Sequence, residues 1–180
     1  GTGGDGGFSV AASASKTFSA SLSLGGFGGD GGIANAVRVD NYGTIQTGGK
    51  DSHAIFAQSV GGEGGSGAFS VAGGVSGNTA VNASFGGAGG EGGLSSNVIV
   101  NSFGELISTS GEHAYGILAQ SVGGSGGDGG FSIAGGISKT LAISFAMGGS
   151  GGDGGTAGDV VVSNASIVAT SGTNAHGIFA

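Results

Sequence analysis

An internal repeat of 61 or 62 residues constrains the fold of this chain more than any other feature of its sequence. The segment Phe-Ser-Val-Ala begins at Phe8 and at Phe69, and it returns as Phe-Ser-Ile-Ala at Phe131. A second segment, Ile-Phe-Ala-Gln-Ser-Val from Ile55, returns as Ile-Leu-Ala-Gln-Ser-Val from Ile117. Units that cannot bury an apolar face alone bury it by stacking on their neighbours. The repeat therefore predicts a solenoid.

The repeat also sets the expected domain organisation. We expect a single repeat array over residues 1–180, with about three copies at 1–61, 62–123 and 124–180. Both ends of the sequence fall inside a repeat, so we expect the array to have been cut from a longer chain.

Apolar residues alternate along two stretches of each repeat, which is the period of a half-buried strand. We expect the first stretch to turn one set inward: Val37, Val39, Asn41, Gly43, Ile45 and Thr47, then Val98, Val100, Ser102, Gly104, Leu106 and Ser108, then Val160, Val162, Asn164, Ser166, Val168 and Thr170. The second stretch holds Phe18, Ala20, Leu22 and Leu24, with counterparts Thr79, Val81, Ala83 and Phe85, and Leu141, Ile143, Phe145 and Met147. We expect these sets to stack like on like and to form a continuous core. Asn41 and Asn164 are expected to hydrogen-bond along the axis or to cap a turn.

Composition narrows the solenoid to a type. The chain has 48 Gly, no Pro, no Cys and 37% hydrophobic residues. So much glycine raises the entropic cost of ordering, and large side chains are too few for a globular core. Disorder is the alternative for such a composition, but the alternating apolar pattern opposes it. The fold class predicted is all-β, a parallel β-solenoid of the right-handed β-helix type.

Glycine clusters such as Gly25–Gly32 and Gly148–Gly155 have a period of three, with two Gly followed by one other residue. Three residues per turn is the period of the polyproline II helix. The runs are therefore either extended three-fold helices or flexible loops. Equal run lengths in all repeats favour order.

The same clusters raise the possibility of calcium as a cofactor. Residues Gly123 to Asp128 match the start of the calcium-binding nonapeptide G-G-x-G-x-D-x-U-x, but Gly130 stands where a large apolar residue is required. The calcium candidates are Asp5, Asp30, Glu91, Asp128 and Asp153. With one carboxylate per run, we expect instead solvated charges that accept local backbone N–H groups, and no cofactor.

No catalytic constellation is present in the sequence, and we expect no enzyme activity. His53 and His176 share a repeat position with Tyr115, which argues against a catalytic or metal role, and His113 is predicted in a turn one residue longer than its counterparts. A net charge of −7 without a basic patch predicts no nucleic-acid partner. No apolar run in these residues is long enough to span a bilayer.

The segment Ala114–Gly124 (AYGILAQSVGG), the GGxGGDGGFS runs and the N-x-G-x-I-x-T pattern of Asn41 to Thr47 resemble the passenger repeats of large Gram-negative autotransporter proteins, which are type V secreted. The resemblance covers the whole chain. It implies export across the outer membrane and a β-helical stalk at the cell surface. It also implies roles in adhesion, aggregation or biofilm formation.

Three hypotheses for function follow. The first is a structural or adhesive surface protein, a passenger-type stalk that self-associates into fibres or binds a host or neighbouring cell surface. The second is a calcium-dependent repeat binding module of the secreted Gly-Asp-rich type. The third is a stalk that only spaces a functional tip located elsewhere.

Overall fold

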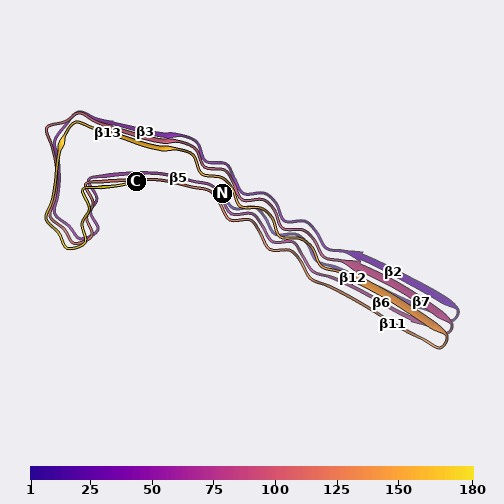
Figure 1. Cartoon of the computed structure of the whole chain (residues 1–180). Coiled ribbons are helices and arrows are strands. Elements are labelled where there is room, and N and C mark those ends of the chain that lie inside the picture. The colour runs from indigo at the N-terminus through magenta and orange to yellow at the C-terminus, as the bar shows by residue number, and fades with distance from the viewer. The chain divides into compact units, whose positions relative to one another are not determined.

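The computed structural model describes all residues from 1 to 180, and its regular secondary structure consists of β-strands alone. The strands form five separate three-stranded sheets, each built from one strand of every repeat (Figure 1). All pairings are parallel and join a residue to its counterpart one repeat away, for example Ser9 to Ser70 and Ser70 to Ser132. The prediction of an all-β fold with stacked parallel strands is confirmed. The structure contains no helix that could cross a bilayer.

The chain divides into two compact units, and every repeat contributes one stretch to each. Unit 1 comprises 1–33, 61–93 and 124–155, and unit 2 comprises 34–60, 94–123 and 156–180.

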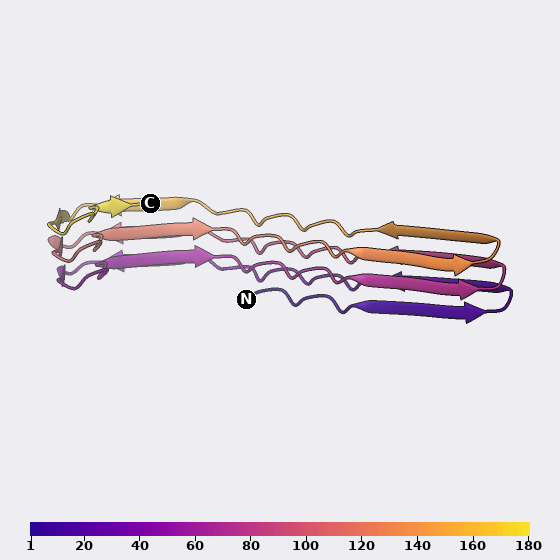
Figure 2. The same cartoon turned by 90° about the horizontal axis from the view of Figure 1, so that it is seen from below.

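Unit 1 contains two sheets that lie face to face. One sheet has the order β1 (Ser9–Ser15), β6 (Ser70–Ser76) and β11 (Ser132–Ser138). The other has the order β2 (Phe18–Leu24), β7 (Thr79–Phe85) and β12 (Leu141–Met147). Two-residue turns connect β1 to β2, β6 to β7 and β11 to β12, so each repeat forms a strand–turn–strand arch. Figure 2 shows the three arches stacked from indigo to orange.

The space between these two sheets is narrow and is filled by small polar side chains. Ser13 and Ser21 share a hydrogen bond of 2.7 Å across it, and so do Ser70 and Ser84. Direct contact between hydroxyl groups on opposite strands leaves no room for a large side chain. The interior of the arch is therefore a layer of Ser, Ala, Gly and Asn.

The second alternating set consequently faces the opposite way from the prediction. Phe18 and Leu22 are 58% and 63% exposed, and Phe145 is 51% exposed, while Ser19, Ser21 and Ser23 are buried. The residues do stack like on like. The expectation that Phe18, Ala20, Leu22, Leu24 and their counterparts form a core is wrong, because the narrow space between the sheets admits only the serine face.

The glycine runs of unit 1 are ordered. The N–H of Gly65 donates to the carbonyl of Gly29, and the carbonyl of Gly65 accepts from Gly90, both at 2.8 Å. Such bonds recur at every third residue, and no glycine has a positive φ. This is the pattern of packed polyproline II helices, and the flexible-loop interpretation is wrong. A Cβ on Gly65 would collide with the backbone of Gly4, which is why the contacting positions are glycine.

Unit 2 contains the apolar core. Its three sheets have the orders β3 (Val37–Asn41), β8 (Val98–Ser102), β13 (Val160–Asn164); β4 (Ile45–Thr47), β9 (Leu106–Thr109), β14 (Ile167–Thr170); and β5 (Ile55–Val60), β10 (Ile117–Val122), β15 (Ile178–Phe179). Val98, Val100, Ile107 and Ile117 are fully buried in this core. Val37, Val39, Val160 and Val162 pack against it, which confirms the predicted inward face of these strands.

Asn41 has both of the roles expected from the sequence. Its Nδ2 donates to the hydroxyl of Ser102 in the next repeat and to the carbonyl of Gly43 in its own turn.

The predicted register of the middle repeat is wrong by one residue beyond Ser102. Ile45 pairs with Ile107, and Thr47 pairs with Thr109, so Ile107 and Thr109 are buried in place of Leu106 and Ser108. The extra residue of this repeat lies between Ser102 and Leu106, since Ser102 pairs with Asn41 61 residues earlier and Ile107 pairs with Ile45 62 residues earlier.

His113 is therefore not in a lengthened turn, as the sequence suggested. Asp51, His113 and Asn174 occupy the same position of successive repeats, and their φ values are 56°, 55° and 54°. These are left-handed conformations, which Asp and Asn tolerate better than most residues.

Candidate functional site

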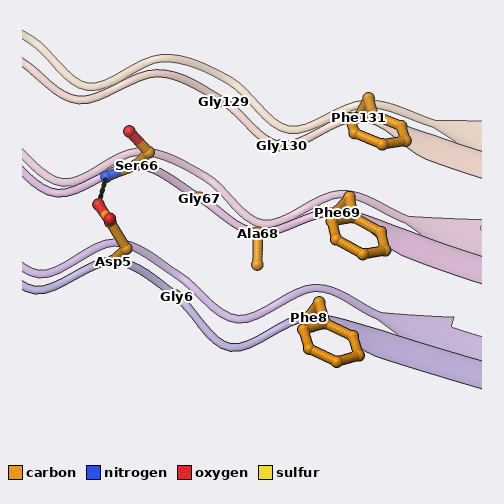
Figure 3. Close-up of a pocket in the computed structure, with 10 residues that line it drawn as sticks. All are labelled: Asp5, Gly6, Phe8, Ser66, Gly67, Ala68, Phe69, Gly129, Gly130 and Phe131. Carbon is orange, nitrogen blue, oxygen red and sulfur yellow. Dashed lines mark hydrogen bonds between the residues drawn. The ribbon is translucent and has the colours of Figure 1, made fainter.

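The acidic residues of the glycine runs were the predicted metal candidates, and the structure places them on the exposed third position of the polyproline II helices. The Oδ1 of Asp5 accepts from the N–H of Ser66 at 2.8 Å (Figure 3), and the Oδ1 of Asp30 accepts from the N–H of Glu91 at 2.9 Å. The expectation that these carboxylates accept backbone N–H groups is confirmed for these two residues. The donor is not local, however, because it belongs to the next repeat.

These positions offer a poor set of ligands for calcium. Asp30, Glu91 and Asp153 follow one another along one edge of the stack, whereas Ser66 separates Asp5 from Asp128. The structure brings no three His, Cys, Asp or Glu side chains together in an arrangement that could hold a metal ion. Calcium takes six to eight oxygen ligands, and here each repeat presents one carboxylate per run.

A column of aromatic rings runs beside Asp5. Phe8, Phe69 and Phe131 stack with centroid separations of 5.2 Å and interplanar angles of 4° and 10° (Figure 3). They line an open hollow of about 320 Å³. Apart from Asp5 and Ser66, which bond to each other, its lining is glycine, alanine and phenylalanine. Each stacked pair contributes roughly 0.5–1.5 kcal/mol to axial stacking, and no set of polar groups converges on a ligand.

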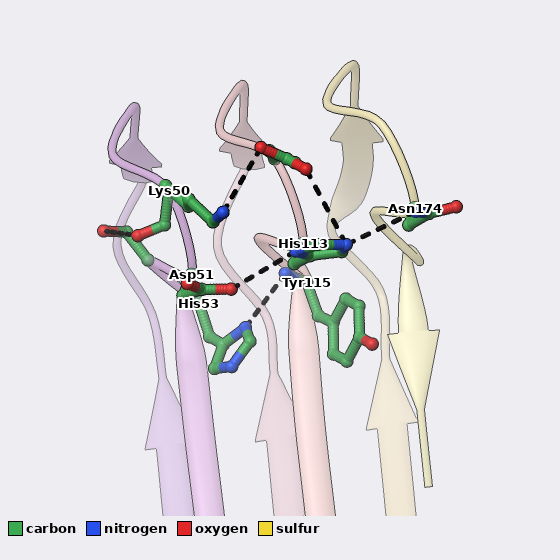
Figure 4. Close-up of polar contacts among 8 residues, drawn as sticks. Lys50, Asp51, His53, His113, Tyr115 and Asn174 are labelled. Carbon is green, nitrogen blue, oxygen red and sulfur yellow. Dashed lines mark hydrogen bonds and ion pairs between the residues drawn. The ribbon is translucent and has the colours of Figure 1, made fainter.

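The turns of unit 2 hold the histidines (Figure 4). The Nδ1 of His113 lies 3.6 Å from the Oδ1 of Asp51, and its Nε2 lies 3.9 Å from the Oε1 of Glu112. Lys50 pairs with the same Glu112 at 3.5 Å. The carboxylates and Lys50 are at least half exposed, and ion pairs of this kind contribute little to stability. No Ser, Thr or Cys takes part in these contacts as a nucleophile.

His53 and His176 also act along the axis. The Nδ1 of His53 accepts from the N–H of Tyr115 at 3.0 Å, and the two rings stack at 4.9 Å. Tyr115 and His176 continue the column at 5.2 Å. The shared repeat position predicted from sequence is thus a stacking position, in which His and Tyr replace each other as flat rings.

The pKa values of Arg38 and Asp40 are both shifted where β3 stacks on β8. The Nε of Arg38 donates to the Oδ2 of Asp40 at 2.9 Å, and the Nδ2 of Asn101 donates to its Oδ1 at 2.7 Å. These two hydrogen bonds, first that from Arg38, hold the pKa of Asp40 below its ordinary value. The shift thus reflects one hydrogen bond within β3, from Arg38, and one axial hydrogen bond, from Asn101 on β8.

The most distinctive surface of the molecule comprises the two outer faces of the arches in unit 1. The groove face, on β1, β6 and β11, consists of Val10, Ala12, Ala14, Val71, Gly73, Val75, Ile133, Gly135 and Ile137. The ridge face, on β2, β7 and β12, consists of Phe18, Ala20, Leu22, Leu24, Thr79, Val81, Ala83, Phe85, Leu141, Ile143, Phe145 and Met147. Neither face contains a charged residue. Sequence alternation identified which residues share the ridge face but could not say that it points outward.

No family model matches this chain, and no curated protein is similar to it. A search of solved structures found similarity to the nine polyproline type II helical bundle springtail antifreeze protein from Granisotoma rainieri. The two are 22% identical, the similarity covers 73% of this chain and 93% of the other, and the TM-score is 0.17. A TM-score this low supports no statement about fold or function. The fold and the proposed function are therefore argued from the residues of this chain alone.

Proposed function

We propose that this chain is a structural segment of an extracellular repeat protein of the autotransporter passenger type. In this proposal it forms an extended β-solenoid stalk that self-associates at a Gram-negative cell surface and contributes to adhesion. The observation that carries the proposal is the register. All fifteen strands pair in parallel with the equivalent strand of an adjacent repeat.

The free edges of the sheets support growth along the axis. In each sheet the middle repeat is paired on both sides, while the strands of the outer repeats, such as β4 and β14, are paired on one side only. An unpaired strand edge presents N–H and C=O groups to which a further strand can bind. A further repeat, on the same chain or on another molecule, can therefore continue the stack.

The residues that resemble autotransporter passenger repeats have axial roles. In the A-Q-S-V segment, Ala119 is fully buried, and the Nε2 of Gln58 donates to the Oε1 of Gln120 at 3.2 Å. The hydroxyl of Ser121 donates to the carbonyl of Ser96 in its own repeat and accepts from the N–H of Gly158 in the next repeat, both at 2.9 Å. The motif thus reads as a stacking motif, which favours a scaffold role.

The contacts of Lys50, Asp51, Glu112 and His113 include no hydroxyl or thiol nucleophile, and the carboxylates of the glycine runs are spread along the stack. A scaffold role is therefore favoured over an enzyme or a calcium-dependent module.

Electron microscopy and fibre diffraction of the purified chain test this proposal. We expect filaments with a reflection along the fibre axis at about 4.8 Å, the spacing of hydrogen-bonded strands. Ile167→Lys places a charge on the free edge strand β14 and should suppress growth; Leu106→Lys, at the paired position of the middle strand β9, is the matched control. Chelator should not change growth.

Two outcomes would overturn the proposal. One is a chain that stays monomeric at millimolar concentration. The other is filament growth that Ile167→Lys and Leu106→Lys reduce equally, since that would mean the edge strands do not carry the contact.

A further inference from the structure

The arches of unit 1 are built with their polar side inward. In most sheet-on-sheet packings the large apolar side chains fill the layer between two sheets about 10 Å apart. Here that layer contains Ser70, Ser84 and Asn82, which are at most 1% exposed, while Val75 and Ile137 on the outside are 53% and 71% exposed. The apolar layer that normally holds such sheets together is missing inside the arch and is available on both outer faces.

The two outer faces have matching outlines. Each consists of three strands of seven residues, in the same three repeats. The groove face is hollowed along Ala12, Gly73 and Gly135, where the absence of large side chains leaves a depression of about 510 Å³. The ridge face carries large exposed side chains, including Leu22 and Phe145.

We propose that the groove face of one molecule binds the ridge face of a second copy of this chain, so that arches stack side by side. The interface is heterologous, with a different face contributed by each partner. It desolvates no charge, because the nearest charged residues, Lys16 and Lys139, lie in the turns outside both faces. A second copy is the favoured occupant because its ridge face has strands of the same length and spacing as the groove face. The large side chains of that ridge face can fill the hollow of the groove face. The contact runs perpendicular to end-to-end stacking and does not depend on it.

The area of the faces limits the strength of this contact. A seven-residue strand is about 24 Å long and three strands are about 14 Å wide, which gives roughly 340 Å² on each partner. The total, about 680 Å², is below the 1,200 Å² or so that stable complexes bury. The three repeats should therefore associate weakly and reversibly. Each added repeat would add about 115 Å² per partner, so longer arrays should associate tightly.

Sedimentation equilibrium over a concentration series tests the proposal, with Ile167→Lys as the parent chain so that end-to-end growth does not interfere. We expect self-association at high micromolar to millimolar concentration. Val75→Lys in the groove face and Val81→Lys in the ridge face should each weaken it about tenfold or more, since each buries an unpaired charge. Asn78→Lys, in the turn between β6 and β7, adds the same charge outside both faces and should have no effect.

Mixing the two variants tests the heterologous geometry. The Val75→Lys chain keeps its ridge face and the Val81→Lys chain keeps its groove face, so an equimolar mixture should form one-to-one pairs although neither variant associates alone. Circular dichroism checks that every variant is folded.

Three results would overturn the proposal. The parent chain could stay monomeric at about 1 mM. Either variant could associate as strongly as the parent, which would exclude the face it alters. Finally, the parent could bind neutral phosphatidylcholine vesicles without associating with itself, in which case the apolar faces serve a lipid surface instead.

Discussion

Asn82 shows how single residues set the spacing of the arches. It is 1% exposed, and neither its Nδ2 nor its Oδ1 has a hydrogen-bond partner. Its counterparts in the adjacent repeats are Ser21 and Ser144. The larger side chain fits because the opposite strand has glycine there, and a Cβ on Gly74 would lie 2.5 Å from the Oδ1 of Asn82.

Gly74→Ala should therefore destabilise the chain by about 1–3 kcal/mol, as overpacking of a filled interior does. Gly73→Ala is the matched control, because its Cβ would point outward and meet only the carbonyl oxygen of Gly135 at 3.9 Å. Asn82→Ser should restore part of the loss in the double variant. Urea unfolding followed by circular dichroism measures all three, and equal effects at positions 73 and 74 would contradict this account.

Among the elements, the polyproline II helices depend most on the absence of side chains. The N–H of Gly90 donates to the carbonyl of Gly65, and a Cβ on Gly65 would meet the backbone of Gly4 in less than ordinary van der Waals contact. Both glycines are buried in the middle repeat, whereas Ser66, which follows Gly65, occupies the outward third position.

Gly65→Ala should cost about 3 kcal/mol or more, because neither neighbouring backbone can move without breaking its own hydrogen bonds. Ser66→Ala should change stability by no more than about 0.5 kcal/mol. Amide hydrogen exchange gives the local readout, with protection of the neighbouring Gly N–H groups lost in the first variant and kept in the second. Unchanged protection in Gly65→Ala would show that the runs are not close-packed.

The elements also show what could be predicted from the sequence. A period of two located the strands, and a period of three located the polyproline II helices. Alternation shows which residues share a face of a strand but not which face points inward. For β2 the inward face is decided by the narrow distance between the two sheets, which is a property of the fold and cannot be read from the sequence. The extra residue between Ser102 and Leu106 was hidden because Leu106 and Ile107 are both apolar. At the candidate sites, the exposed, unclustered positions of the carboxylates followed from their spacing, whereas axial bonds such as Asp5 to Ser66 did not, since the sequence shows no neighbour 61 residues away.

At the scale of the molecule, stability should behave as a sum over repeats and the contacts between adjacent repeats. Both units follow this rule separately, because every strand pairing in each unit joins adjacent repeats. Three repeats have two such contacts, and six in one continuous stack would have five.

Joining two copies of the chain through Gln-Ser-Val-Gly, the residues that follow Ala57 in the first repeat, would keep the repeat spacing across the junction. We expect the six-repeat chain to melt at a higher temperature and in a steeper transition, because each end repeat is then a smaller share of a longer cooperative stack. A linker longer by one glycine is the control. The extra residue would lie in the glycine run that follows β5, where the period is three, so it would move larger third residues such as Asp5 onto the close-packed glycine positions. The two halves should then melt as independent three-repeat stacks. Thermal unfolding by circular dichroism distinguishes the cases, and identical melting of both six-repeat chains would mean that register between repeats does not hold the molecule together.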